Sequence, residues 1–183
     1  MQSLMDRGLN PLKVLIDRAH QKGMEFFASL RMSSYGGLKP EFKVPEGGRG
    51  MAHQEIRDHQ FEVLKELATQ YDVDGIELDF AAAPGGMPLI LRKEDVPKFT
   101  PVMTDYVKQI SNMARSRRDR PGQIGARVYP TEQMNLAQGL DVRSWLKQGL
   151  VDYLVPMFYL DFTLDPDMPF GWLVEAAHRA NVS

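Results

Sequence analysis

The stretch Val73-Asp74-Gly75-Ile76-Glu77-Leu78-Asp79-Phe80 alternates its side chains with the two-residue period of a β-strand. One face of this strand is polar and carries two carboxylates, Glu77 and Asp79. The opposite face is apolar and should pack against helices, since it presents Ile76, Leu78 and Phe80. The pattern predicts a buried strand that brings two acids to its carboxyl end.

Helical and strand patterns alternate along the rest of the chain. The spacing of apolar residues predicts strands over 24–32, 73–80, 123–129 and 151–159. It predicts helices over 11–23, 53–71, 96–117, 142–148 and 170–180, and loops over 33–50, 81–95 and 131–140. Strands that alternate with helices favour an α/β fold with parallel pairing.

The loops after the strands are long, and the turns after the helices are short. This asymmetry is typical of a (β/α) barrel, whose long loops build the active face. A complete eight-stranded barrel needs roughly 250 residues, whereas this chain has 183 residues. We therefore expect residues 1–183 to be a single domain that is a piece of a larger barrel. The alternative is a complete doubly wound sheet, although no Gly-rich nucleotide-binding loop follows a strand.

A partial barrel would have unpaired strands at both edges of its sheet. Such edges invite pairing, so the expected partners are the missing strands of a longer parent chain or other copies of this one. Composition excludes several other partners. A net charge of −2 and a pI near 6.1 do not suit a nucleic-acid binder, and no apolar run of about 18 residues suggests a membrane span.

Other features of the composition exclude two kinds of covalent or metal site. The chain has no cysteine, so disulfides and thiolate zinc sites are excluded. No signal peptide is visible at the amino end, and the sequence does not indicate a compartment. No His-x-His pair closes a strand and no cofactor motif is present, so we expect neither a metal nor a cofactor.

Charged residues lie near the carboxyl end of each predicted strand. They are Arg31, the Glu77/Asp79 pair, Arg127 and Asp161. The first three groups should share the inward face, so two arginines and two carboxylates would meet at one rim. This arrangement suits a site for a hydroxyl-rich or anionic ligand, or else a structural ion-pair network, because buried charges must be paired.

The two carboxylates can divide the work of acid catalysis. Neighbouring like charges raise one another's pKa, so one of the pair can hold a proton near neutral pH. Asp79 lies nearer the strand end and is the predicted general acid, with Glu77 as its electrostatic support. Tyr129 and Tyr159 are the predicted sugar-stacking aromatics, and Asp74 is expected to cap the start of the strand.

The segment from Asp74 to Phe80 resembles the fourth-strand motif of glycoside hydrolase barrels. Family-18 chitinases carry the pattern Asp-Gly-x-Asp-x-Asp-x-Glu in this strand. The matching positions here are Asp74, Gly75, Glu77, Asp79 and Ala81. Alanine stands where the resemblance requires the catalytic glutamate, which argues against chitinase chemistry.

A closer resemblance is to uncharacterised bacterial glycosyl-hydrolase-like barrels related to the family-10-like group. It covers most of the chain, through the segments 11–32, 71–80, 149–156 and 172–178. The resemblance implies a (β/α)8 barrel of which this chain supplies strands three to six, with Glu77 and Asp79 on strand four. Many barrel hydrolases place a second carboxylate on strand seven, which would lie beyond Ser183.

These observations predict a carbohydrate-active enzyme, specifically a glycoside hydrolase with Asp79 as acid and Glu77 in support. The expected substrate-binding residues are Arg31, Arg127, Tyr129, Tyr159 and Asp161. Two alternatives stay open. One is a carbohydrate-binding barrel without catalysis, which Ala81 favours, and the other is a non-sugar barrel enzyme whose carboxylates hold Mg²⁺ or Ca²⁺.

Overall fold

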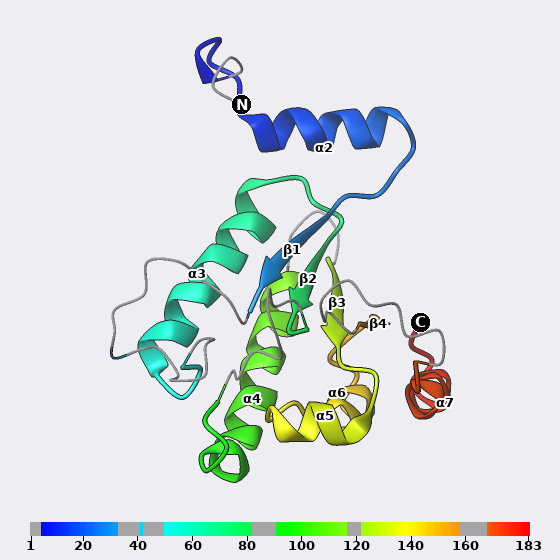
Figure 1. The fold of residues 1–183 in the computed structure, drawn as a ribbon. Coiled ribbons are helices and arrows are strands. Elements are labelled where there is room, and N and C mark those ends of the chain that lie inside the picture. The colour runs from blue at the N-terminus through cyan, green and yellow to red at the C-terminus, as the bar shows by residue number, and fades with distance from the viewer. Residues whose placement is uncertain (1–4, 33–40, 42–49, 82–90, 117–121, 158–167) are drawn as a thin grey trace.

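The computed structural model describes residues 5–32, 41, 50–81, 91–116, 122–157 and 168–183. Helices and strands alternate through these residues as the sequence predicts (Figure 1). The elements, in chain order, are α2 (Pro11–Gln21), β1 (Phe27–Arg31), α3 (Gln54–Gln70), β2 (Gly75–Asp79), α4 (Val96–Arg115), β3 (Gln123–Val128), α5 (Glu132–Ala137), α6 (Val142–Lys147), β4 (Tyr153–Pro156) and α7 (Gly171–Arg179).

The four strands form one parallel sheet in the order β1-β2-β3-β4. Each strand lies next to its neighbour in sequence, and helices connect them, which is the repeating unit of a (β/α) barrel. The predicted fold class is confirmed: the chain is an α/β protein with the architecture of a partial TIM barrel. The described residues supply four of the eight strands that a closed barrel contains.

The main core lies between the sheet and the helices α3, α4 and α6. Ile76 and Leu78 of β2 are almost completely buried there, as the alternation in the sequence predicts. Side chains from the neighbouring strand and from the helices complete this layer, among them Ile124, Ala126, Leu64, Ile110 and Trp145. The sheet therefore has one apolar face against helices, and its other face is left for polar residues.

The predicted loop over 131–140 is wrong in part, because it contains the helix α5. Thr131 caps this helix, its side chain accepting a hydrogen bond from the backbone N–H of Met134. The short length of α5 explains why periodicity did not reveal it: six residues give too few turns for an apolar stripe.

The strands are shorter than predicted. β1 begins at Phe27 rather than at residue 24, because its ladder partner β2 begins at Gly75 and the two residues are paired in register. β4 begins at Tyr153 rather than at residue 151 and ends at Pro156. Residues 158 and 159, which the sequence assigned to the same strand, lie outside the described residues.

Helix α2 lies apart from the other helices, at the amino ends of the strands (Figure 1). It is capped by Asn10, as predicted, and packs a small separate core of Ile16, Ala28 and Val73. Asp74 holds this end of the sheet: its Oδ2 accepts hydrogen bonds from Phe26 N at 2.7 Å and His20 Nε2 at 2.9 Å. The prediction that Asp74 caps the start of its strand is confirmed.

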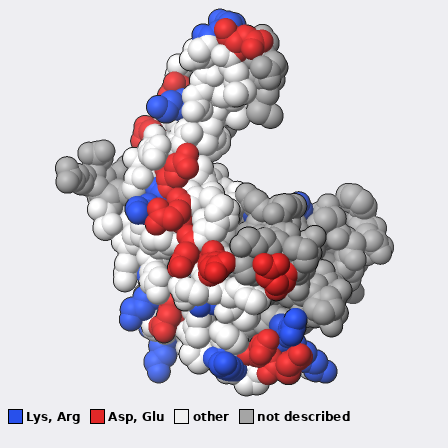
Figure 2. Space-filling model, turned by 90° about the vertical axis from the view of Figure 1, so that its left-hand side faces the viewer, with Lys and Arg blue, Asp and Glu red and all other residues white. Residues whose placement is uncertain are grey.

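The outer face of α3 is solvent-exposed and acidic. It carries Glu55, Asp58, Glu62 and Glu66, and Figure 2 shows acidic side chains running down this side of the molecule. None of the helices in the described segments has the length and apolar character needed to cross a bilayer.

Replacing Leu78 by alanine tests the assignment of the two sheet faces. Leu78 is 0% exposed, so we expect the free energy of unfolding to fall by about 2–5 kcal/mol in urea titrations. Leu15→Ala is the matched control, because Leu15 is 59% exposed and its loss should change stability by less than about 0.5 kcal/mol. Equal effects of the two substitutions would contradict the assignment.

Candidate functional site

The candidate site lies on the inner face of the sheet, which is the face opposite α3 and α4. Residues paired in register share a face of a parallel sheet. The register therefore assigns to the inner face Phe27, Ser29 and Arg31 of β1, Gly75, Glu77 and Asp79 of β2, Gln123, Gly125 and Arg127 of β3, and Tyr153 and Val155 of β4. Glu77 and Asp79 share this face, as the sequence predicts.

Glu77 is hydrogen-bonded by side chains from all three other strands. Its Oε1 accepts from Ser29 Oγ at 2.9 Å and from Arg127 Nε at 2.6 Å. Its Oε2 accepts from the Tyr153 hydroxyl at 3.3 Å. The Glu77 carboxylate is buried, and these donors offset the cost of its desolvation. They also fix its orientation.

Two glycines make room for aromatic rings on the inner face. A Cβ atom on Gly125 would overlap the ring of Tyr153, and one on Gly75 would overlap the ring of Phe27. The two rings lie over their glycines and meet edge to face, with centroids 5.4 Å apart and planes at 89°. Gly125 thus allows Tyr153 to reach across the sheet to Glu77.

The Tyr153 hydroxyl donates a hydrogen bond to Glu77, and its surroundings favour the protonated phenol. Burial raises the pKa of its phenol far above the ordinary tyrosine value, the Glu77 carboxylate raises it further, and Arg127 opposes the shift. Tyr153 and Ser29 were missed by sequence reasoning. Ser29 lies two residues before Arg31, and Tyr153 lies two residues before Val155, so the members of each pair share a face of their strand. Polar residues on the inward face of the neighbouring strands would therefore have been the signal to look for.

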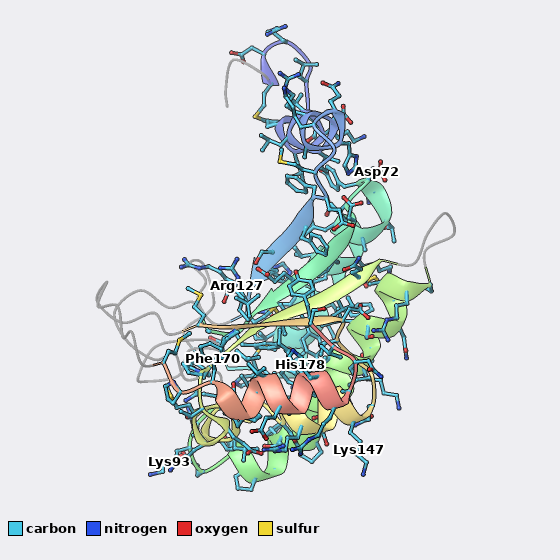
Figure 3. The ribbon with its side chains drawn as sticks, turned by 90° about the vertical axis from the view of Figure 1, so that its right-hand side faces the viewer. Asp72, Lys93, Arg127, Lys147, Phe170 and His178 are labelled. Carbon is cyan, nitrogen blue, oxygen red and sulfur yellow. The ribbon has the colours of Figure 1, made fainter. Side chains whose placement is uncertain are left out.

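Asp79 is the last residue of β2 and is 5% exposed. Its neighbours in register are Arg31 on β1 and Arg127 on β3, so the structure brings the predicted arginines to either side of it. Figure 3 shows Arg127 at the carboxyl ends of the strands, with Asp72 at the opposite end of the sheet. The predicted convergence of charge at this rim is therefore present for the described residues.

Tyr129 is a buried neighbour of Asp79 and does not present its ring to solvent. It is 1% exposed, and its hydroxyl donates to the carbonyl oxygen of Phe80 at 3.3 Å. Burial and then the negative charge of Asp79 raise the pKa of the Tyr129 phenol far above its ordinary value. Asn135 of α5 holds the backbone of Tyr129 through hydrogen bonds to its N–H and C=O.

Two predicted site residues, Tyr159 and Asp161, lie outside the described residues. Within the segments that the structure describes, no three His, Cys, Asp or Glu side chains are grouped closely enough to hold a metal ion. The chemistry that the described site can support is therefore that of a fixed carboxylate, a second carboxyl group beside it, and two arginines.

The architecture is similar to that of solved glycoside hydrolases. The chitinase domain of the spore coat protein CotE from Clostridium difficile superposes with a TM-score of 0.52 at 13% identity, over 94% of this chain and 50% of that one. An α-amylase from Anoxybacillus superposes with a TM-score of 0.50 at 14% identity, over 80% of this chain and 33% of that one.

At these identities the similarity establishes a glycoside-hydrolase-like barrel fold and nothing finer. The chain spans about a third of the amylase and half of the chitinase domain. No protein-family model and no curated protein sequence matches the chain.

Substituting Gly125 by alanine tests the packing of Tyr153. The new methyl group would displace the ring, so we expect a loss of about 1–3 kcal/mol in the free energy of unfolding. Truncating the ring in Gly125→Ala/Tyr153→Ala should make the glycine substitution much less costly than it is alone. Gly171→Ala is the control, because open space surrounds Gly171. Additive effects at the two positions would refute the proposed overlap.

Alkaline titration tests the environments of Tyr129, which is buried, and Tyr153, which is half-buried. Because their pKa values are higher in the folded chain, the folded chain retains protons that the unfolded chain releases above the ordinary value of about 10. This contribution is intact below pH 10, and the free energy of unfolding should fall as the pH rises above it. Tyr153→Phe and Tyr129→Phe should each flatten that fall in denaturant titrations; an unchanged slope in both variants would be incompatible with the raised pKa values.

Proposed function

We propose that this chain is part of a carbohydrate-active enzyme that cleaves glycosidic bonds by carboxylate acid/base chemistry. The observation that carries the proposal is the placement of Asp79 at the carboxyl end of β2, beside a carboxylate fixed by three other strands. In barrel enzymes the chemistry takes place at this end of the strands. The fold similarity to glycoside hydrolases supports the same class of reaction.

Asp79 is proposed as the general acid that protonates the leaving oxygen of the glycosidic bond. Glu77 is suited to a different role, because both of its oxygens already accept hydrogen bonds. Its fixed negative charge would stabilise the positive charge that develops on the sugar ring in the transition state. The two acids would thus share the work as proton donor and electrostatic support.

The binding residues proposed around these acids are Arg31 and Arg127, whose strands flank β2. Tyr129 would contribute a buried hydroxyl beside Asp79, and its ring would not stack against the sugar. Tyr159 and Asp161 remain predictions from the sequence, and so does the narrower kinship to the family-10-like group.

A second candidate function is carbohydrate binding without catalysis. It is favoured by Ala81, which is 2% exposed and packs within the main core at the position where the chitinase pattern has its glutamate. A binding protein would keep the arginines and the fixed carboxylate but would need no proton donor. The described residues offer no comparable support for a metal-dependent enzyme.

Asp79→Asn separates the two candidates. If Asp79 is the general acid, the variant should lose about 10²–10⁴-fold in turnover on a panel of polysaccharides, because the amide cannot donate the proton. Saccharide binding, measured by calorimetry, should persist.

The matched control is Asp17→Asn on the exposed side of α2, which should leave turnover unchanged. Turnover that is equal in Asp79→Asn and the unaltered protein would remove Asp79 from catalysis. Binding of saccharides with no cleavage by the unaltered protein would favour the second candidate.

A further inference from the structure

The acidic and the basic residues of the inner face differ in their exposure to solvent. The two carboxylates are buried, Glu77 being 6% and Asp79 5% exposed. The two arginines in register with Asp79 are more accessible: Arg31 is exposed, and the side chain of Arg127 is 37% exposed. A ligand that approaches this rim therefore meets positive charge first, although the four groups together are formally neutral.

Both arginines have unused hydrogen-bond donors. The side chain of Arg31 has no hydrogen bond or ion pair to any residue that the structure describes. Arg127 donates from Nε to Glu77 and makes a long Nη1 contact of 3.8 Å with the sulfur of Met157. Its Nη2 has no hydrogen-bond partner in the described part of the chain. Since an arginine presents five N–H donors, most of this capacity remains for a ligand.

The two arginines are placed so that they can act on one group. Both are in register with Asp79, one on each neighbouring strand. Adjacent strands lie about 4.8 Å apart, so the two Cα atoms are separated by about 10 Å. Arginine side chains are long enough to close that distance around a ligand held above Asp79, and guanidinium groups bind carboxylate and sulfate oxygens through paired hydrogen bonds.

We propose that the saccharide bound at this site is anionic, and that Arg31 and Arg127 recognise its carboxylate or sulfate group. The inference rests on the proposed carbohydrate function and names its class of substrate. Of the two arginines, Arg31 is the better test, because Arg127 also holds Glu77 in place. The shared chemistry is an oxyanion on a sugar ring, and the probes below distinguish the two sources.

Calorimetric titration with matched saccharide pairs tests the proposal. The first pair is trigalacturonic acid and its methyl ester, which differ in the charge of the carboxyl groups. The second pair is a sulfated carrageenan oligosaccharide and the neutral agarose oligosaccharide. We expect the charged member of at least one pair to bind about ten-fold more tightly, with a preference that weakens as salt is raised from 50 to 200 mM. The pair that shows the preference identifies the anionic group.

Variants of Arg31 make the result specific. Arg31→Gln should abolish most of the preference for the charged saccharide while leaving the affinity for the neutral one, and Arg31→Lys should retain part of it. Arg18→Gln on α2 is the control, because Arg18 is exposed at the opposite end of the sheet and should not alter binding.

Three results would overturn the inference. Equal affinities within both pairs would show that the site does not select an anion, and a preference that survives Arg31→Gln would show that Arg31 does not recognise it. In both cases the proposed carbohydrate function would stand. Failure of every saccharide to bind, charged or neutral, would overturn the carbohydrate function together with this inference.

Discussion

The buried carboxylate of Glu77 is the constraint on which the inner face of the sheet depends. A charge removed from water must be paired and hydrogen-bonded, or the fold is destabilised by several kcal/mol. Here the donors come from Ser29, Arg127 and Tyr153, one on each of the other strands. A single acid on β2 therefore links the four strands on the face opposite α3 and α4, while apolar packing links them on the other.

The demand for donors around Glu77 determines the residues nearby. The Tyr153 hydroxyl can reach the carboxylate across β3 because Gly125 leaves room for the ring, and Phe27 packs against that ring because Gly75 leaves similar room. At the amino end of the sheet a different pair of acids does structural work. Asp74 accepts the N–H of Phe26, and Asp152 likewise accepts the N–H of Ile124 while pairing with Arg115. The acids that precede strands hold the amino end of the sheet together, whereas Glu77 and Asp79 lie toward the carboxyl end of β2.

The sequence predicted the fold well because the fold is specified by local periodicity. The two-residue alternation around Glu77 assigned both faces of β2, and helix caps such as Asn10 identified where elements begin. Short elements were harder, because the six residues of α5 carry too little periodicity and are defined by the Thr131 cap. The network around Glu77 was predicted only in part. Arg127 was named because it is charged, whereas pairing with Tyr153 depends on strand register, which no single stretch of sequence contains.

The position of Ala81 bears on how any chemistry at this rim must work. β2 ends at Asp79, and Ala81 is already packed among buried apolar residues, so a carboxylate at position 81 would be buried without the partners that Glu77 has. The last acid that the strand presents is therefore Asp79. A proton donor at this position lies two residues earlier on the strand than the glutamate of the chitinase pattern, and Arg31 and Arg127 are in register with it on the neighbouring strands. Catalysis and recognition would then depend on the same row of the sheet, so a ligand held by Arg31 and Arg127 would be positioned directly against the acid.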